Sequence, residues 1–526
     1  MNYDKYSATK SSESKKGGIN VSAHIYKGIP GKPESFWIAT TPETNFPNLK
    51  KAMTVDVAVI GGGITGITSA LLLKKAGLSV AVIESDRIIK GVTGNTTAKI
   101  TSQHSLTYAY LIAKFGEVLA RQYADANQAG IEKIASLAEE HHIDCEFIRQ
   151  PAYTYTLPGG KRDQVIEEVA AAKKLGLPAT FVESIPLPFK VDGAIRFDNQ
   201  AQFHPRKYLL SLAKIIDGNG SYIFEKTRAV DVKEGTPCTV ITDKGEFKAK
   251  NVIIATNYPF NDKYGLYNAR LFPSQSYALG LKIEETFPEG MYISTGNPVY
   301  SLRSHPVETG QLVIAVGENH RTGQGGNTII HYKKLEEATK KLFKVTSVEY
   351  RWTTEDYISV DLVPYIGKLT QDSSHLYVAT GFKKWGMTHG TVAGMILTDL
   401  IQGKQNPWSQ VFDPGRFDIE QAKKENIFAV GLASETPPSP PAGDPLQLGL
   451  GEGALLQAKN HKVAAYKDPD GNIYTLSGNC THMGCTVTWN EAESTWDCQC
   501  HGSRFNYKGC VIHDPAVTDL GEINLE

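Results

Sequence analysis

The stretch Val55-Asp-Val-Ala-Val-Ile60-Gly61-Gly-Gly63-Ile-Thr-Gly66 decides how the first part of this chain is expected to fold. A short apolar run of this kind is typical of a buried parallel strand, and apolar residues recur at helical spacing over residues 64–76. A second strand is expected over residues 79–83, directly before Glu84. Strand, glycine-rich turn, helix, strand and acidic residue in this order predict a βαβ unit that binds a dinucleotide.

Each residue of the fingerprint has its own physical role. Gly61 permits the tight turn, Gly63 lets the backbone approach a pyrophosphate, and Gly66 allows the helix to pack closely on the strand. Glu84 can accept hydrogen bonds from ribose hydroxyls, and the free N–H groups at the helix N-terminus favour phosphate. NAD and FAD use the same geometry, so the fingerprint alone does not choose between them.

Three further segments favour FAD. Residues 91–98 form a Gly/Thr-rich loop that contains Gly94 and Thr97, and residues 248–257 read as a strand that ends in a small-residue turn. Residues 376–380 are a predicted strand, followed by the glycine-containing segment 381–390 and a helix over residues 391–401. A late strand, glycine turn and helix supply the free N–H groups that hold the ring end of FAD in flavin enzymes.

This order of segments resembles the FAD-dependent oxidoreductases of the D-amino-acid oxidase, glycine oxidase and γ-glutamylputrescine oxidase group, with matches at residues 61–66, 84, 361–367 and 381–390. The resemblance implies an α/β Rossmann-type FAD-binding domain (residues 46–150, 191–260 and 346–427). It also implies an antiparallel-sheet substrate domain (residues 151–190 and 261–345). No cysteine lies in residues 91–100 or 381–390, so non-covalent FAD is expected. The expected FAD contacts are Gly61, Gly63, Gly66, Glu84, Gly94, Thr97, Gly381, Gly386, Met387 and Thr388.

A second motif lies near the C-terminal end of the sequence. Residues 480–485 read Cys-Thr-His-Met-Gly-Cys, and residues 498–505 read Cys-Gln-Cys-His-Gly-Ser-Arg-Phe. Cys-x-His followed by Cys-x-x-His is the ligand set of a Rieske [2Fe–2S] centre, with Cys480 and Cys498 on one iron and His482 and His501 on the other. Mixed Cys/His pairs also bind zinc, although Cys-x-His is unusually tight spacing for a zinc loop.

The similarity to Rieske proteins extends beyond these ligands. It implies a disulfide between Cys485 and Cys500, a hydrogen bond from Ser503 to a bridging sulfide, and a third cluster loop at residues 514–516. The resemblance to the flavin group then covers the whole chain as its branch with a C-terminal Rieske domain. We expect a Pro-rich linker (residues 428–445), which should be semi-rigid, and a small all-β Rieske domain (residues 446–526).

Composition narrows the class of protein. The chain has 526 residues, 41% of them hydrophobic, and a formal net charge of -1, so nothing favours nucleic acid as a partner. No apolar run reaches the ~20 residues of a membrane span. Residues 1–45 are polar, read as a mobile lead-in and lack a signal-peptide core, so cytoplasmic residence is expected and a disulfide would have to persist there. Of the seven cysteines, Cys145, Cys238 and Cys510 are expected to be small buried apolar residues.

The leading hypothesis is an FAD dehydrogenase that oxidises a small amine or amino-acid-like substrate and passes single electrons through its cluster to an unknown acceptor. The reverse direction of electron flow stays open. Arg303 is a candidate carboxylate clamp, His320 a candidate substrate-orienting residue and Trp385 a candidate wall of the flavin ring, whereas His204 is expected to be structural. Lys99 follows the Gly/Thr-rich loop, but the sequence assigns it no role.

Two alternatives remain. One is a redox-sensing or electron-transfer protein with little turnover. The other is a Rieske oxygenase, which would need a mononuclear iron site built from two His and a carboxylate after the cluster. His513 is the sole histidine after His501, which argues against the oxygenase.

Overall fold

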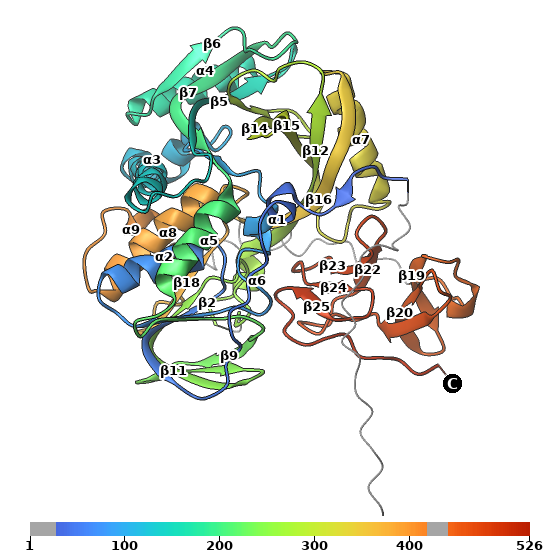
Figure 1. Cartoon of the computed structure of the whole chain (residues 1–526). Coiled ribbons are helices and arrows are strands. Elements are labelled where there is room, and N and C mark those ends of the chain that lie inside the picture. Colours follow the sequence, from blue (N-terminus) through green and yellow to red (C-terminus); the bar gives the residue numbers. More distant parts are fainter. Residues whose placement is uncertain (1–27, 263, 418–439, 526) are drawn as a thin grey trace, which may run out of the picture.

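A computed structural model describes residues 28–262, 264–417 and 440–525. A large body built on two sheets lies beside a small C-terminal β domain (Figure 1). No helix within the described ranges is long and apolar enough to cross a membrane.

The first sheet is the predicted dinucleotide-binding sheet. Its main strand order is β17-β18-β11-β2-β3-β8, and four neighbouring pairs within it are parallel. The strands are β2 (Thr54–Ile60), β3 (Val80–Ile83), β8 (Tyr222–Phe224), β9 (Ala229–Lys233), β10 (Cys238–Thr242), β11 (Gly245–Ile254), β17 (Tyr365–Lys368) and β18 (Leu376–Thr380). The helices α2 (Ile64–Lys75), α5 (Pro205–Ile216) and α8 (Gly386–Ile401) pack together beside this sheet (Figure 1). The Rossmann-type fold is therefore confirmed.

The second sheet has ten strands in the order β1-β16-β12-β15-β14-β13-β5-β7-β4, with β6 paired to β7. As expected, most of its pairs are antiparallel, among them β12 with β15 and β16, and β14 with β15. The sheet is nevertheless mixed, because β13 pairs with β5 and β1 pairs with β16 in parallel. The strands are β1 (Lys32–Pro33), β4 (Lys99–Ile100), β5 (Ile148–Thr156), β6 (Ala179–Val182), β7 (Gly193–Gln202), β12 (Leu271–Ile283), β13 (Met291–Ser294), β14 (Ser301–Val307), β15 (Gly310–Arg321) and β16 (Val345–Ser359).

Sheet membership differs from the segment boundaries expected from sequence. β7 lies within residues 191–260 and β16 almost wholly within 346–427, both expected in the FAD-binding domain, yet β7 pairs with β5 and β16 with β12 in the second sheet. The reason is that these long strands satisfy their backbone hydrogen bonds on partners far away in the sequence. The two sheets are thus interwoven along the chain.

Several helices complete the large body. The long helix α3 (Tyr108–Glu140) was not anticipated from the motifs, and it contains a non-helical Gly116 with φ of 80°. The remaining helices are α4 (Arg162–Lys174), α6 (Tyr267–Arg270), α7 (Ile329–Lys340) and α9 (Ser409–Phe412).

Residues 28–45 form a segment that we call the N-terminal strap. It contains β1, which pairs with β16, and the short helix α1 (Phe36–Ala39). Trp37 is fully buried and donates from Nε1 to Thr96 O (2.7 Å), while Ser35 Oγ donates to Gly94 O (2.5 Å). The expectation of a mobile lead-in is therefore wrong for the described residues 28–45, and residues 1–27 lie outside the described ranges.

The C-terminal domain contains two small antiparallel sheets, as expected. They are formed by β19 (Gly453–Ala458), β20 (His461–Lys467) and β21 (Ile473–Ser477), and by β22 (Val487–Asn490), β23 (Thr495–Cys498), β24 (Arg504–Asn506) and β25 (Val511–His513). Most of the expected linker, residues 428–439, lies outside the described residues. Cys145 and Cys238 are buried as expected, but Cys510 is exposed because its turn lies at the domain surface.

Candidate active site and cluster centre

One cavity of about 880 Å³ lies where the two sheets and the C-terminal domain meet. Its walls include the turn after β2, the loop following β3, strands β12, β15 and β16, and residues 382–387 before and at the start of α8. The C-terminal domain contributes Glu493, Thr495, Arg504 and residues 512–514. Ligand pockets in proteins are commonly about 300–1,000 Å³, so this cavity is large enough for a cofactor.

The turn after β2 is shaped for close approach of a ligand. Gly61 has φ of 107°, and a Cβ there would lie 2.5 Å from Ala255 O. Glu84 Oε2 accepts from Gly62 N (2.8 Å), Oε1 accepts from Asp86 N (2.9 Å), and burial raises the pKa of this carboxyl. The start of α2 opens onto the same cavity wall. A glycine cradle, a helix N-terminus and an acidic side chain fit a dinucleotide such as FAD.

The predicted FAD contacts fall into two groups. Gly61, Gly63, Glu84, Thr97, Gly386 and Met387 line the cavity. Gly66, Gly94, Gly381 and Thr388 lie behind its wall. A Cβ on Gly66 would overlap Gly61 O, so this glycine allows α2 to pack on β2. Thr388 Oγ1 donates to Thr101 O (3.1 Å), which ties α8 to the segment after β4.

The three candidate catalytic residues are placed differently from one another. Trp385 lines the cavity and stacks on His104, with ring centroids 4.9 Å apart. Arg303 is fully buried outside the cavity lining; it donates to Ala98 O (3.0 Å), lies 3.1 Å from His305 Nδ1 and packs over Trp37. His320 also lies outside the lining, with Nε2 2.9 Å from Tyr277 Oη. The Arg303 guanidinium is therefore not positioned to bind a substrate carboxylate in this cavity.

Three buried titratable side chains that received no role from the sequence, Lys99, Asp356 and Lys384, line the cavity. Burial, with the nearby Arg303 guanidinium, lowers the pKa of Lys99 to about 7, and its Nζ donates to Tyr292 O (3.2 Å) and Ser301 Oγ. Burial raises the pKa of Asp356 to about 6 and lowers that of Lys384 to about 8. Lys99 is close to the Gly/Thr-rich loop in sequence, but Asp356 reaches the cavity only through the pairing of β16 with β12.

The four predicted cluster ligands come together in the C-terminal domain. Cys480, Cys498 and His501 are buried, and the His482 and His501 rings lie 5.0 Å apart at 89°. Both Nδ1 atoms are buried and have no hydrogen-bond partner among the described residues. The Cys480 and Cys498 thiols are hydrogen-bonded to each other, which lowers the pKa of Cys480 and raises the pKa of Cys498. Two free thiols and two buried imidazole nitrogens without a hydrogen bond to another described residue form a ligand set that fits a Rieske cluster.

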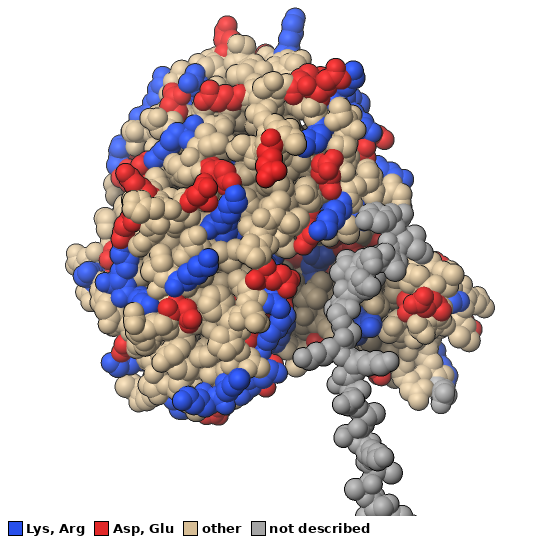
Figure 2. Space-filling view, viewed as in Figure 1, with Lys and Arg blue, Asp and Glu red and all other residues tan. Residues whose placement is uncertain are grey.

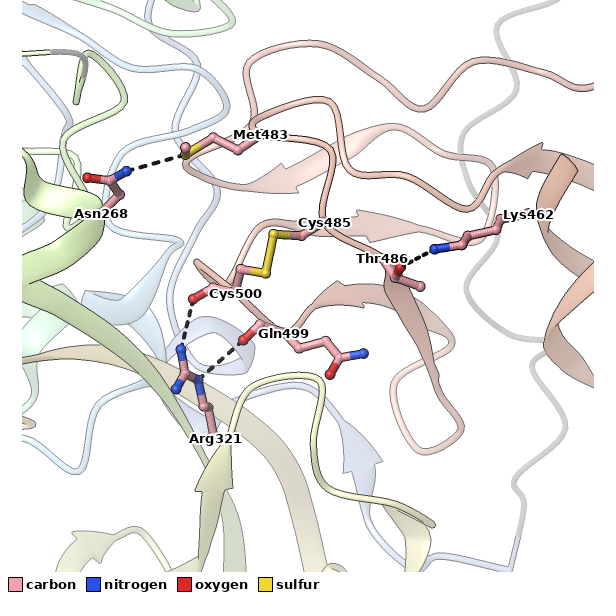
Figure 3. The surroundings of a disulfide bond; sticks show 8 residues. All are labelled: Asn268, Arg321, Lys462, Met483, Cys485, Thr486, Gln499 and Cys500. Atoms are coloured by element: carbon pink, nitrogen blue, oxygen red, sulfur yellow. Dashed lines mark hydrogen bonds between the residues drawn. A yellow bond between two sulfur atoms is a disulfide. The ribbon is translucent and has the colours of Figure 1, made fainter. Parts of the chain in front are cut away.

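The two other cysteines of the motif form a disulfide, Cys485–Cys500, that joins the two cluster loops (Figure 3). The sulfurs of Cys485, Cys498 and Cys500 lie within 4.8 Å of one another, but the disulfide leaves Cys498 as the only free thiol of the three. This trio is therefore not a metal site. Ser503 Oγ accepts from Ala516 N (3.0 Å), so the second cluster loop also contacts the third.

The two histidines of the C-terminal domain that are predicted iron ligands, His482 and His501, face the large body. His482 Nε2 lies 3.1 Å from Asp262 Oδ2, and the Tyr258 ring lies 6.0 Å from the His482 ring and 6.4 Å from the His501 ring. Arg321 donates to Gln499 O (3.3 Å) and Cys500 O (3.2 Å) (Figure 3). Acidic and basic side chains are interspersed on the face shown in Figure 2, without a field of one sign.

Comparisons with known proteins agree with both halves of this description. Residues 56–400 match the family described as FAD dependent oxidoreductase, and residues 441–524 match the Rieske [2Fe-2S] domain. YhfW of Bacillus subtilis (strain 168), a protein named for a Rieske 2Fe-2S centre, is 38% identical over 499 residues, which are 94% of this chain and 98% of YhfW. The γ-glutamylputrescine oxidoreductase of Escherichia coli (strain K12) is 25% identical over 378 residues, 68% of this chain and 86% of that protein.

A solved structure extends the likeness at the level of the fold. Glycine oxidase from Geobacillus kaustophilus has a TM-score of 0.57 and 18% identity, and the match covers 69% of this chain and 99% of that chain. Fold and site thus define a flavin-dependent oxidoreductase joined to a Rieske [2Fe–2S] domain. The chain belongs to the FAD dependent oxidoreductase family and has a Rieske [2Fe-2S] domain at residues 441–524. Its cofactors are FAD and a [2Fe–2S] cluster.

Proposed function

We propose that this protein oxidises a small amine or amino-acid-like substrate by hydride transfer to FAD and passes the electrons singly to its Rieske cluster. A one-electron acceptor then reoxidises the cluster. The observation that carries the proposal is the single cavity bordered both by the dinucleotide-binding turn and by Arg504, His513 and Asp514 of the Rieske domain. The names of the relatives, γ-glutamylputrescine oxidoreductase and glycine oxidase, support the substrate class.

FAD supplies two-electron acceptance from carbon and one-electron release, and the cluster takes one electron at a time. The side chains and backbone of the protein would bind FAD, orient the substrate and accept the proton that the substrate ammonium loses. The turn after β2 and the Gly386–Met387 backbone are the proposed holders of FAD. Trp385 is the proposed aromatic wall, because it lines the cavity and its ring is fixed by His104.

Lys99 is the proposed proton acceptor for the substrate ammonium. Its pKa of about 7 follows mainly from burial, so the neutral amine form increases as pH rises through about 7. We expect the rate of flavin reduction to rise over that interval, and Lys99→Met to remove the rise and to slow reduction about a hundredfold. Anaerobic stopped-flow absorbance across pH 5.5 to 9 measures both effects. The surface variant Lys368→Met is the control, and a Lys99→Met profile that matches wild type would contradict the role.

Phe505 sets an expectation for the cluster potential. It is fully buried in the same hydrophobic cluster as Cys480 and Cys498, at a position where Tyr in high-potential Rieske proteins would donate a hydrogen bond near a ligand sulfur. We expect a potential below that of respiratory Rieske proteins, and Phe505→Tyr to raise it by about 60 mV, the one-electron equivalent of about 1.4 kcal/mol. Redox titration followed by EPR measures the shift, and an unchanged or lower potential would refute it.

The proposed function is tested by anaerobic titration of the holoprotein with a panel of primary amines, polyamines and amino acids, followed by visible absorption and EPR together. The expected result is flavin bleaching by at least one class of compound, with the reduced-cluster EPR signal appearing afterwards. Bleaching without any cluster signal would exclude the internal transfer. No bleaching by any compound, with both cofactors intact, would instead favour a redox sensor or electron-transfer protein with little turnover.

A further inference from the structure

Strand β16 forms a wall shared by the two cofactor sites. Side chains on a strand alternate between its two faces. Thr354, Asp356 and Ile358 line the FAD cavity, whereas Tyr357, between two of them, points to the Rieske domain. A single strand therefore contacts both sites with neighbouring residues.

The side chain of Tyr357 is hydrogen-bonded to the cluster loops. Its Oη lies 3.0 Å from His501 O and 3.1 Å from Asp514 O, and its one hydroxyl proton is available to these two carbonyl oxygens. The residue is fully buried, and its ring centroid lies 5.0 Å from that of Tyr258 and 6.1 Å from that of His513. Because His501 is a predicted iron ligand, this hydrogen bond reaches the residue that holds the cluster.

The backbone of the same residue is bonded to the flavin side. Tyr357 O accepts from Lys383 N (3.0 Å), and Ile358 forms an isolated bridge with Phe382. Phe382 and residues 383–387 line the cavity. A route of covalent and hydrogen bonds thus runs from His501 through Tyr357 to Lys383, and Tyr357 is the only intermediate residue.

We propose that Tyr357 is the positioning residue that couples the FAD site to the Rieske cluster for electron transfer. The inference rests on the proposed function. Each transfer would move one electron from reduced FAD to the oxidised cluster, and the one-electron acceptor would reoxidise the cluster before the next transfer. After two such transfers FAD would again be oxidised, and the proton that arrived with the hydride would leave to solvent. Electron tunnelling weakens steeply across unbonded gaps, so the buried hydrogen bond from Tyr357 to His501 O would shorten the unbonded part of the route between the two centres.

The test is Tyr357→Phe, which removes the hydroxyl and retains the ring and the backbone carbonyl. The holoprotein is reduced by laser-flash photoreduction with 5-deazariboflavin and EDTA, and absorbance follows electron equilibration between flavin and cluster. We expect equilibration to slow about tenfold, equivalent to about 1.4 kcal/mol of activation free energy, because an unbonded gap replaces the hydrogen bond. Cofactor content, the cluster EPR spectrum and both midpoint potentials should stay as in wild type. Tyr357→Leu, which also removes the ring, should be at least as slow.

A matched control is Tyr332→Phe. Tyr332 is likewise a buried tyrosine of the large body whose hydroxyl bonds to the Rieske domain, donating to Glu493 Oε1 (2.9 Å), but it contacts no cluster ligand. Its variant should equilibrate at the wild-type rate. Equal rates in wild type and in both Tyr357 variants would overturn the inference, as would equal slowing by Tyr332→Phe. A wild-type protein in which no electron passes between the centres would instead refute the proposed function itself.

Discussion

Gly66→Ala is expected to yield a protein with little bound FAD. A Cβ at this position would overlap Gly61 O of the turn after β2 and approach Val59 Cγ1 to 3.3 Å, so helix and strand must move apart. Overpacking of this kind costs about 1–3 kcal/mol, and here it displaces the backbone that is to hold the pyrophosphate. We expect FAD affinity to fall at least about tenfold, because each 1.4 kcal/mol corresponds to a factor of ten. Flavin absorbance per chain after gel filtration, and titration of the apoprotein with FAD, measure the loss.

The control for this variant is Gly521→Ala. Gly521 lies in the Rieske domain, and a Cβ there would meet no atom within 4 Å. It should retain FAD and the cluster at wild-type levels. Full FAD occupancy in Gly66→Ala would show that the close contact between α2 and β2 is not needed for cofactor binding.

His482→Ala is expected to abolish the cluster and to leave FAD bound. The substitution removes one of two imidazole ligands, and its buried Nδ1 has no other partner among the described residues. Iron should fall from about two atoms per chain towards zero, with loss of the EPR signal of the reduced protein. Because cluster binding is coupled to folding, the Rieske domain should also unfold at a lower temperature. Metal analysis, EPR and calorimetry measure these changes.

His461→Ala provides the comparison, since His461 is an exposed histidine on β20 of the same domain. This variant should keep its iron and its spectrum. Retention of a normal cluster in His482→Ala would disprove the ligand assignment, and zinc in place of iron in the wild-type protein would establish the alternative metal.

The parts of this protein that were predictable from sequence are those whose signal is local. The βαβ unit was expected to have a helix over residues 64–76, and α2 spans Ile64–Lys75, because apolar spacing and the flanking glycines set both ends. The four proposed ligands lie on two short loops, so their spacing in the sequence was enough to predict a Rieske ligand set. Folding adds only the approach of those two loops, which the disulfide joins.

Long-range packing explains what the sequence did not reveal. Arg303 on β14 looked like a substrate residue, but Trp37 of the N-terminal strap packs against it and carbonyl Ala98 O accepts its hydrogen bond. Tyr357 belongs to no recognisable sequence motif, and its hydrogen-bond partner His501 is 144 residues away, so the contact could not be predicted from sequence. Asp356 likewise gained a place in the cavity only through strand pairing. No local pattern reports such contacts.

The N-terminal strap has a consequence for the order of assembly. Its partners include Tyr350 and Arg351 on β16, more than three hundred residues later in the chain, and Gly94 and Thr96 in the loop beside the cavity. During synthesis the strap is made before β16, and it can dock only after β16 has been made. Domains form as units while the chain is translated from its N-terminus, so this segment must wait in an undocked state. We therefore expect that the loop it secures is completed late, and that cofactor capture follows release of most of the chain from the ribosome.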